Sequence, residues 1–262
     1  LLVSQLVGSC SRQLPAELYA SQNVKLSKHS PPLKKKLKGV EWEKRTEDGK
    51  AVYDIRLTTG SYFIDRHEVS NLRYEAFMKK TGHRIPGFWN DSRFNGPRLP
   101  VVGVSFEDSR LYCKWAGKRL PTEAEWEFAA RGGLEQMRYA WGDEMTPGGE
   151  HRCNIWQGRF PDYNSGDDGY LGTSPVDAFP PNGFGLYNVS GNVWEWTWDG
   201  YANYPAGSAT DPNGLESAPT RVLRGGSWDF FARNGRAAQR YYTTPAWRYH
   251  FYGFRPARSL SP

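Results

Sequence analysis

Residues 185–196 read GLYNVSGNVWEW, and three further segments carry similarly dense combinations of glycine, charged and aromatic residues. They read GKRLPTEAEWE at 117–127, RGGSW at 224–228 and GFR at 253–255. Residues 193–197 (VWEWT) and 220–224 (TRVLR) have the composition of short strands. Between 133 and 221 the chain otherwise consists mostly of turn-forming combinations such as Pro-Asn-Gly and Asp-Gly. The sequence therefore predicts an irregular, loop-rich α+β domain.

Regular elements are predicted mainly before this region. Strands are expected at 52–57 and 61–65, joined by a turn at Thr59-Gly60. A helix is expected at 71–80, capped by Ser70 and ended by Gly82, with Leu72, Tyr74, Ala76 and Phe77 along one face. Two more helices follow capping boxes, each formed by a hydroxyl residue and an acid three positions later. The pairs are Ser105 with Asp108 and Thr122 with Glu125.

The chain has 262 residues and a net charge of +6, enough for one large domain, or one domain with a tail. Lysines concentrate between 25 and 45, which is typical of a solvated tail; contact with a membrane surface or nucleic acid is the alternative. No nucleic-acid-binding module follows, so we expect no nucleic-acid partner. Residues 11–38 are predicted to be a disordered basic linker, and 39–262 the folded domain.

The N-terminal end carries an apolar run followed by Val7-Gly8-Ser9-Cys10. This arrangement resembles a bacterial lipobox, so residues 1–10 are predicted to be part of a signal peptide, and Cys10 the lipidation site. The resemblance implies a protein held by a lipid anchor at the bacterial surface, on the outer membrane. The alternative is a leader in which Cys10 is incidental. A disulfide between Cys113 and Cys153 is possible, and the sequence does not decide whether it forms.

Together the four segments quoted above resemble the formylglycine-generating-enzyme-like domain, the sulfatase-modifying-factor branch of the C-type lectin fold. The resemblance covers roughly residues 50–258 and implies that fold. In the enzymes of this branch the matching segments bind calcium, which here implies structural Ca²⁺ at two sites. The first comprises Asn154, Ile155, Asp168 and Tyr170, and the second Asn188, Gly191, Val193 and Glu195. Side-chain and carbonyl oxygens suit calcium; the alternative is that these residues cap turns.

The same resemblance argues against catalysis. The enzymes need a reactive cysteine pair shortly after the Gly-Gly-Ser-aromatic motif, where copper-dependent oxidation takes place. Here residues 229–236 read DFFARNGR and contain no cysteine. The five histidines are dispersed and do not form the cluster that iron-dependent relatives require. We therefore expect no enzyme activity and no catalytic cofactor.

Residues 229–252 instead contain eight aromatic residues out of 24. Exposed aromatic clusters usually mark binding sites. The surrounding framework resembles the variable region, here about 225–258, of proteins diversified by retroelements, including spirochaete variable surface lipoproteins. By that resemblance, interchangeable contact residues project onto one exposed face from a framework of Ala232, residues 235–240, Pro245 and Trp247. The expected contact residues are Asp229, Phe230, Phe231, Arg233, Asn234, Tyr241, Tyr242, Thr243, Tyr249, His250, Phe251 and Tyr252.

The leading hypothesis is thus a surface-displayed ligand-binding protein with a hypervariable C-terminal segment. Its ligand is expected to be a macromolecule, protein rather than carbohydrate, and the protein itself a monomer. Two alternatives stay open. One is a relative of the formylglycine-type oxidases without the catalytic cysteine pair, and the other is a non-catalytic paralogue of fixed specificity.

Overall fold

The computed structural model describes residues 62–204, 212 and 214–259, together with the backbone of three strands closer to the N-terminus. These strands are β1 (Asn23–Leu26), β2 (Trp42–Glu47) and β3 (Lys50–Ile55). Cys10 and most of the predicted linker lie outside the described residues. Strand β1 falls within residues 11–38 and pairs with β4 (Tyr62–Asp65).

The strands predicted at 52–57 and 61–65 do not pair with each other. Strand β3 pairs with β2, whereas β4 lies between β1 and β11 (Ala257–Ser259) in a separate sheet. Residue 62 begins β4 near the start of the predicted segment, so the alternating sequence located the strand but not its partner. Alternation identifies the two faces of a strand, and it carries no information about distant partners.

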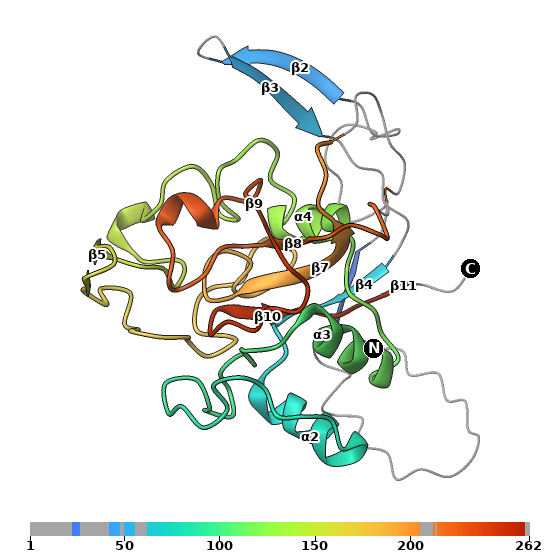
Figure 1. Cartoon of the computed structure of the whole chain (residues 1–262). Helices are drawn as coiled ribbons and strands as arrows, with labels where there is room; N and C mark the ends of the chain where they lie inside the picture. Colours follow the sequence, from blue (N-terminus) through green and yellow to red (C-terminus); the bar gives the residue numbers. More distant parts are fainter. Residues whose placement is uncertain are drawn as a thin grey trace.

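Three of the four segments quoted above contribute strands to the central sheet, and the fourth, 117–127, leads into α4 (Glu123–Arg131) (Figure 1). The strand order of this sheet is β10-β7-β8-β9, with β10 (Tyr252–Phe254) parallel to β7 (Trp194–Gly200). Strands β8 (Arg221–Arg224) and β9 (Arg240–Thr243) continue it in antiparallel fashion. The two strands predicted near 193–197 and 220–224 are therefore confirmed. Every strand that flanks the C-terminal aromatic segment belongs to this sheet.

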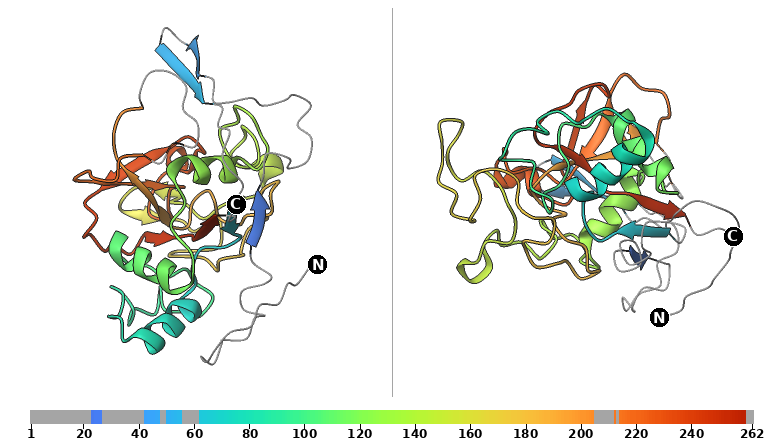
Figure 2. Two further views of the ribbon diagram at one scale, coloured as in Figure 1. Left: turned by 90° about the vertical axis from the view of Figure 1, so that its right-hand side faces the viewer. Right: turned by 90° about the horizontal axis from the view of Figure 1, so that it is seen from below.

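Helices cover the sheet from two sides (Figures 1 and 2). On one side, α2 (Asn71–Thr81) and α3 (Phe106–Trp115) pack against Trp194 and Trp196 of β7. On the other side, α4 (Glu123–Arg131) packs against β7 and β8, and its Trp126 donates to Glu195 Oε2. Side chains alternate along a strand, so β7 contributes its tryptophans to one core and Glu195 to the other side.

Both predicted capping boxes are present, at the starts of α3 and α4. Gly82 ends α2 in the left-handed conformation, as predicted. Ser70 precedes α2 but makes no capping bond through its side chain, and Leu72 is half-exposed rather than on the buried face. Ser70 thus occupies the predicted N-cap position without the side-chain bond, whereas the prediction that Leu72 lies on the buried face is wrong; Tyr74 and Phe77 supply that face.

The long loops between α4 and β7 contain only short elements. They are β5 (Gly158–Arg159), β6 (Tyr163–Asn164) and a 3₁₀ turn at Pro147–Gly149; a second such turn, Ala232–Gly235, lies in the C-terminal segment. Cys113 and Cys153 are both free and buried, so they do not form the disulfide that the sequence left open. None of the helices within the described ranges has the length and apolar character needed to cross a membrane.

Candidate ligand-binding surface

The C-terminal segment begins at a tight turn made by Gly225 and Gly226, both with positive φ. A Cβ atom on Gly226 would lie only 2.8 Å from the carbonyl oxygen of Asn234, so glycine allows the chain to return against itself here. Trp228 follows with 6% of its surface exposed, and its amide donates to Asn192 O at 3.0 Å. The burial of Trp228 therefore fixes the start of the segment.

Arginines fix the rest of the framework. Arg224, fully buried, donates to Glu127 and to the carbonyl oxygen of Ala237. Arg240 makes a bidentate pair with Glu123, at 2.6 and 2.8 Å. Arg240 also donates to Ala202 O, and Arg236 donates to Arg233 O, so both arginines of the predicted framework 235–240 contact the backbone.

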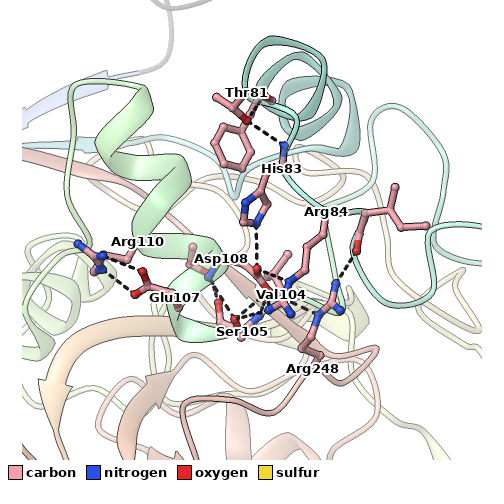
Figure 3. Close-up of polar contacts among 12 residues, drawn as sticks. Thr81, His83, Arg84, Val104, Ser105, Glu107, Asp108, Arg110 and Arg248 are labelled. Atoms are coloured by element: carbon pink, nitrogen blue, oxygen red, sulfur yellow. Dashed lines mark hydrogen bonds and ion pairs between the residues drawn. The ribbon is translucent and has the colours of Figure 1, made fainter.

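A third anchor lies at the N-terminus of α3 (Figure 3). Arg248 donates to the carbonyl oxygens of Gly103 and Ile85, and its Nε lies 3.4 Å from Asp108 Oδ2. Burial alone would raise the pKa of Asp108, but hydrogen bonds from Arg84, from Ser105 and from His83 lower that pKa to about 2. The carboxylate thus remains charged and ties the loop that carries Tyr249 to α3.

Aromatic rings of this segment and of residues 156–160 form two groups, joined by the hydrogen bond from Trp156 N to Phe230 O, and together we call them the aromatic surface. Phe230 contacts Tyr241 and Phe251, with ring centroids 6.0 and 5.3 Å apart. Phe251 stacks on Tyr249 at 5.3 Å, and Tyr249 contacts Trp247 at 5.5 Å. Its members are Trp156, Phe160, Phe230, Phe231, Tyr241, Trp247, Tyr249 and Phe251. Phe160, Phe231, Trp247 and Tyr249 are the most exposed of these side chains.

Polar contact residues lie beside these rings. The guanidinium of Arg233 lies 4.7 Å from the ring centroid of Phe231. His250 is half-buried, with Nε2 3.3 Å from Asp229 Oδ2, and its ring packs against Trp228. Asn234 is also half-buried, in the 3₁₀ turn. The predicted contact residues Asp229, Arg233, Asn234 and His250 therefore gather around the aromatic surface.

Three of the predicted contact residues do not lie on this surface. Tyr252 has none of its surface exposed, because β10 places it against Trp196 in the core, and Thr243 is also buried. Tyr242 is exposed but points to the opposite face of β9 from Tyr241, where it stacks on Tyr201 at 4.0 Å. The expectation that all contact residues share one exposed face is wrong for these three. Trp247, predicted as framework, is exposed.

Several contributors to the surface come from outside the C-terminal segment. Phe160 contacts Phe231 at 4.9 Å and Trp156 at 5.2 Å, and the Trp156 amide donates to Phe230 O. Trp194 supports Tyr241 from beneath at 5.1 Å. Sequence reasoning missed Trp156 and Phe160; the only available indication was that aromatic residues occur within a loop that otherwise consists of turns.

Neither cysteine in the described residues is exposed, so neither thiol is accessible to a substrate. Cys113 and Cys153 are each 1% exposed, and burial raises the pKa of both thiols. Desolvated thiols with raised pKa are poor nucleophiles and poor metal ligands. In the part of the chain that the structure describes, no three His, Cys, Asp or Glu side chains gather closely enough to hold a metal.

The first predicted calcium set fits an oxygen-seeking cation. Asn154 Oδ1 is buried without a hydrogen-bond partner, while Asn154 Nδ2 donates to Gly172 O. Asp168 accepts from the amides of Ile155 and Tyr170, and burial raises the pKa of its carboxyl group. A cation held by Asn154, Asp168 and the carbonyls of Ile155 and Tyr170 would satisfy the unpaired oxygen and favour the charged carboxylate.

The second set differs in that its acidic ligand already has a partner. Both carboxylate oxygens of Glu195 accept from Arg255, at 2.8 and 3.0 Å, and both side chains are fully buried. Asn188 Oδ1, like Asn154 Oδ1 in the first set, is buried without a hydrogen-bond partner. This set therefore offers a cation one unsatisfied oxygen and a carboxylate whose charge Arg255 already balances.

The chain is similar to several known proteins, in sequence and in structure. The sulfatase-modifying factor enzyme 1-like domain matches residues 34–260. A formylglycine-generating enzyme of Thermomonospora curvata is 43% identical over 262 aligned positions, covering 80% of this chain and 86% of the relative. An inactive Cα-formylglycine-generating enzyme 2 of Bos taurus is 53% identical over 131 residues, covering 50% of this chain and 38% of the relative. Treponema denticola variable protein 1 superposes with a TM-score of 0.69 at 24% identity, over 91% of this chain and 95% of that one.

Proposed function

The chain belongs to the sulfatase-modifying factor enzyme 1-like family, and we propose that it is a non-catalytic member that binds a protein ligand through the aromatic surface. Its fold is the α+β, loop-rich, C-type lectin-like fold of the formylglycine-generating enzymes, so the predicted fold class is confirmed. The family includes both formylglycine-generating enzymes and inactive relatives. Membership alone therefore leaves open whether this chain is catalytic.

The observation that carries the proposal is where the thiols lie. Residues 225–258 contain no cysteine, and Cys113 and Cys153 are buried in the core with raised pKa. Phe230 and Phe231 occupy the stretch after the Gly-Gly-Ser-Trp motif, where the resemblance to the enzymes led us to expect reactive cysteines. Aromatic rings there supply contact area and no redox chemistry.

A protein is the ligand best suited to this surface. Phenylalanine, tyrosine and tryptophan dominate it, with Arg233 and Asp229 at its edge, which is the composition of protein-binding hot spots. The supporting backbone is held by Arg240, Arg248 and the buried Trp228, so little conformational entropy is lost when a ligand binds.

The alternative function is the oxidation implied by the 43% identical formylglycine-generating enzyme. A cysteine-containing peptide incubated with the full chain, copper and oxygen would separate the two, with product aldehyde measured by mass spectrometry. We expect no conversion above the copper-only background, for the wild type and for a C113S/C153S variant alike. Conversion by the wild type that the double variant loses would overturn the non-catalytic proposal.

Hypervariability is a second, finer proposal. It is supported by the division of the segment into anchored framework (Trp228, Arg240) and exposed side chains (Phe231, Tyr249), and by the sequence resemblance to retroelement-diversified proteins. The buried Thr243 and Tyr252 limit the variable set. A near-identical template repeat with a reverse transcriptase beside the gene would support diversification. Their absence from the complete locus would favour a paralogue of fixed specificity. Surface display through a lipidated Cys10 remains part of this second proposal.

A further inference from the structure

The C-terminal segment carries an unbalanced positive charge. Residues 229–252 contain four arginines and no lysine, and Asp229 is their single acidic residue. Two of the arginines pair with acids at the starts of α4 and α3. The other two, Arg233 and Arg236, form no ion pair within the described residues, and both side chains are exposed. Their positive charges are therefore available to a partner.

Contacts within the segment hold these two guanidinium groups in place. That of Arg233 lies 4.7 Å from the ring centroid of Phe231. That of Arg236 donates from Nε to Arg233 O at 2.9 Å and from Nη2 to Gln239 Oε1 at 2.8 Å. An arginine whose orientation is already fixed loses less conformational entropy when it pairs with a carboxylate. Both groups are thus exposed, pre-oriented donors.

A third arginine lies beside them, on the loop that follows α4. The amide of Ala237 donates to Arg138 O at 2.7 Å. Burial raises the pKa of Tyr139, and the charges of Arg138 and Arg236 both act against that rise, so both guanidinium groups lie near this phenol. Arg138 is exposed; Asp143 accepts from its backbone amide at 2.9 Å and forms no ion pair with its guanidinium. We call Arg138, Arg233 and Arg236 the arginine patch.

The arginine patch borders the aromatic surface at Phe231. This ring contacts the guanidinium of Arg233 and also the ring of Phe160, at 4.9 Å. Phe231 is 37% exposed and Phe160 42%, so cationic and apolar groups are exposed side by side. Arginine binds a carboxylate through two parallel hydrogen bonds, whereas the rings bind apolar side chains. A partner that fits both needs carboxylates next to apolar side chains.

A continuous polyanion fits this surface less well than a protein does. Nucleic acids and sulfated polysaccharides carry negative charge along their whole length. Asp229 lies beside the same rings, with Oδ2 3.3 Å from His250 Nε2, and its carboxylate would repel such a chain. A protein can place acidic side chains opposite the arginine patch and apolar ones opposite the rings.

We propose that the aromatic surface binds a protein segment whose acidic side chains flank apolar ones, and that the acidic side chains pair with the arginine patch. The inference rests on the proposed function, since it names the chemistry of the protein that the aromatic surface binds. Charge pairs at the edge of an interface chiefly speed association, and salt screens them. Binding should accordingly be faster at low ionic strength.

A phage-displayed library of random dodecapeptides, selected on the immobilised full chain, tests the composition of the partner. Peptides that survive selection should contain apolar residues together with Asp and Glu, and the two acids should occur at least about twice as often as in the unselected library. Enrichment of apolar residues without acids would refute the inference and leave the proposed function standing. Enrichment of acids alone, or of no peptide at all, would contradict both.

Matched variants locate the acidic contacts on the protein. For the most enriched acidic peptide, Arg233→Gln/Arg236→Gln should lower the association rate constant at low salt at least about fivefold. Both side chains are exposed, so this variant should keep the wild-type melting temperature. Lys79→Gln/Arg98→Gln removes the same charge from two exposed ion pairs elsewhere and should change the rate less than about twofold. Equal falls in the two variants, or no fall in either, would refute the arginine patch as the contact.

A heparin hexasaccharide tests the class of the partner. We expect it to bind the wild type more weakly than the enriched peptide does, because it lacks apolar side chains for the rings. Tighter binding of the hexasaccharide than of every enriched peptide, lost in Arg233→Gln/Arg236→Gln, would assign the arginine patch to a polyanionic polysaccharide and overturn the acidic protein.

Discussion

Arg240 of β9 and Glu123 of α4 form a two-point ion pair across 117 residues of sequence, with Nε–Oε1 at 2.6 Å and Nη2–Oε2 at 2.8 Å. Glu123 also accepts from Arg224 at 3.3 Å and from the hydroxyl of Tyr204 at 3.0 Å. The first turn of α4 thus holds two framework arginines that precede and follow the 3₁₀ turn bearing Arg233. The position of the contact residues near this turn therefore depends on the ion pair between Arg240 and Glu123.

Arg240→Ala should therefore destabilise the fold, because it leaves the nearly buried Glu123 with weaker compensation. We expect a loss of about 1–3 kcal/mol in the free energy of unfolding, measured by urea denaturation. Arg236→Ala is the matched control: that side chain is exposed and, among the described residues, bonds to Arg233 O and Gln239, so its loss should stay below about 1 kcal/mol. An equal loss of unfolding free energy in the two variants would mean that the ion pair with Glu123 contributes no more stability than the exposed bonds of Arg236.

Stability should also depend on Asp199. Burial raises the pKa of Asp199 to about 7, although the backbone amide of Glu123 donates to it at 2.6 Å. A carboxyl group with a raised folded-state pKa contributes stability below its unfolded pKa, near 4, and that contribution is lost as pH rises through about 7. The free energy of unfolding should accordingly fall between pH 5 and pH 8.

Asp199→Asn should flatten this pH profile, because the amide keeps an acceptor for Glu123 N and does not ionise. The fall between pH 5 and pH 8 should shrink by at least about 1 kcal/mol relative to the wild type. Glu68, whose pKa burial raises to about 8, contributes in the same direction and remains in the variant. Identical profiles for the two proteins would show that Asp199 ionises normally.

Calcium should stabilise the loop that carries Asn154 and Asp168. Adding millimolar CaCl₂ to chelator-treated protein should raise the melting temperature, since a ligand that binds only the folded state shifts unfolding. Asp168→Asn should abolish this response; Ile155 N and Tyr170 N donate to different oxygens of Asp168 and the asparagine keeps only one of them, so the quantity compared is the calcium-induced shift in each protein. A response that persists in the variant would place the ion elsewhere, and no response in the wild type would refute the site.

Sequence patterns predicted the elements whose causes are local. The capping boxes at Ser105 and Thr122 need only a residue and its third neighbour, and both are present. The strand at β7 was likewise visible in VWEWT. Local patterns failed at Tyr252, where the parallel pairing of β10 with β7 buries a residue that resembled its exposed neighbours. Pairing partners depend on the whole fold, and no short window contains them.

The sequence likewise indicated only some of the side chains of the candidate surface. Within the dense aromatic stretch, Phe231 and Tyr249 are exposed, so their role as contact residues stays a prediction that the structure allows. Strand alternation should have separated Tyr241 from Tyr242, since adjacent residues of a strand point to opposite faces. Phe160 could not be placed from sequence, because a long loop brings it to Phe231 without any periodic pattern.

The central claim is that exposed contact side chains sit on a separate, buried framework. Thermal unfolding of Tyr249→Ala, Phe231→Ala and Trp228→Ala tests it most directly. We predict that the first two retain the wild-type melting temperature to within a few degrees, whereas Trp228→Ala loses about 3–5 kcal/mol of stability. Equal losses in all three variants would contradict the claim, because the aromatic residues of the segment would then be core rather than a binding surface.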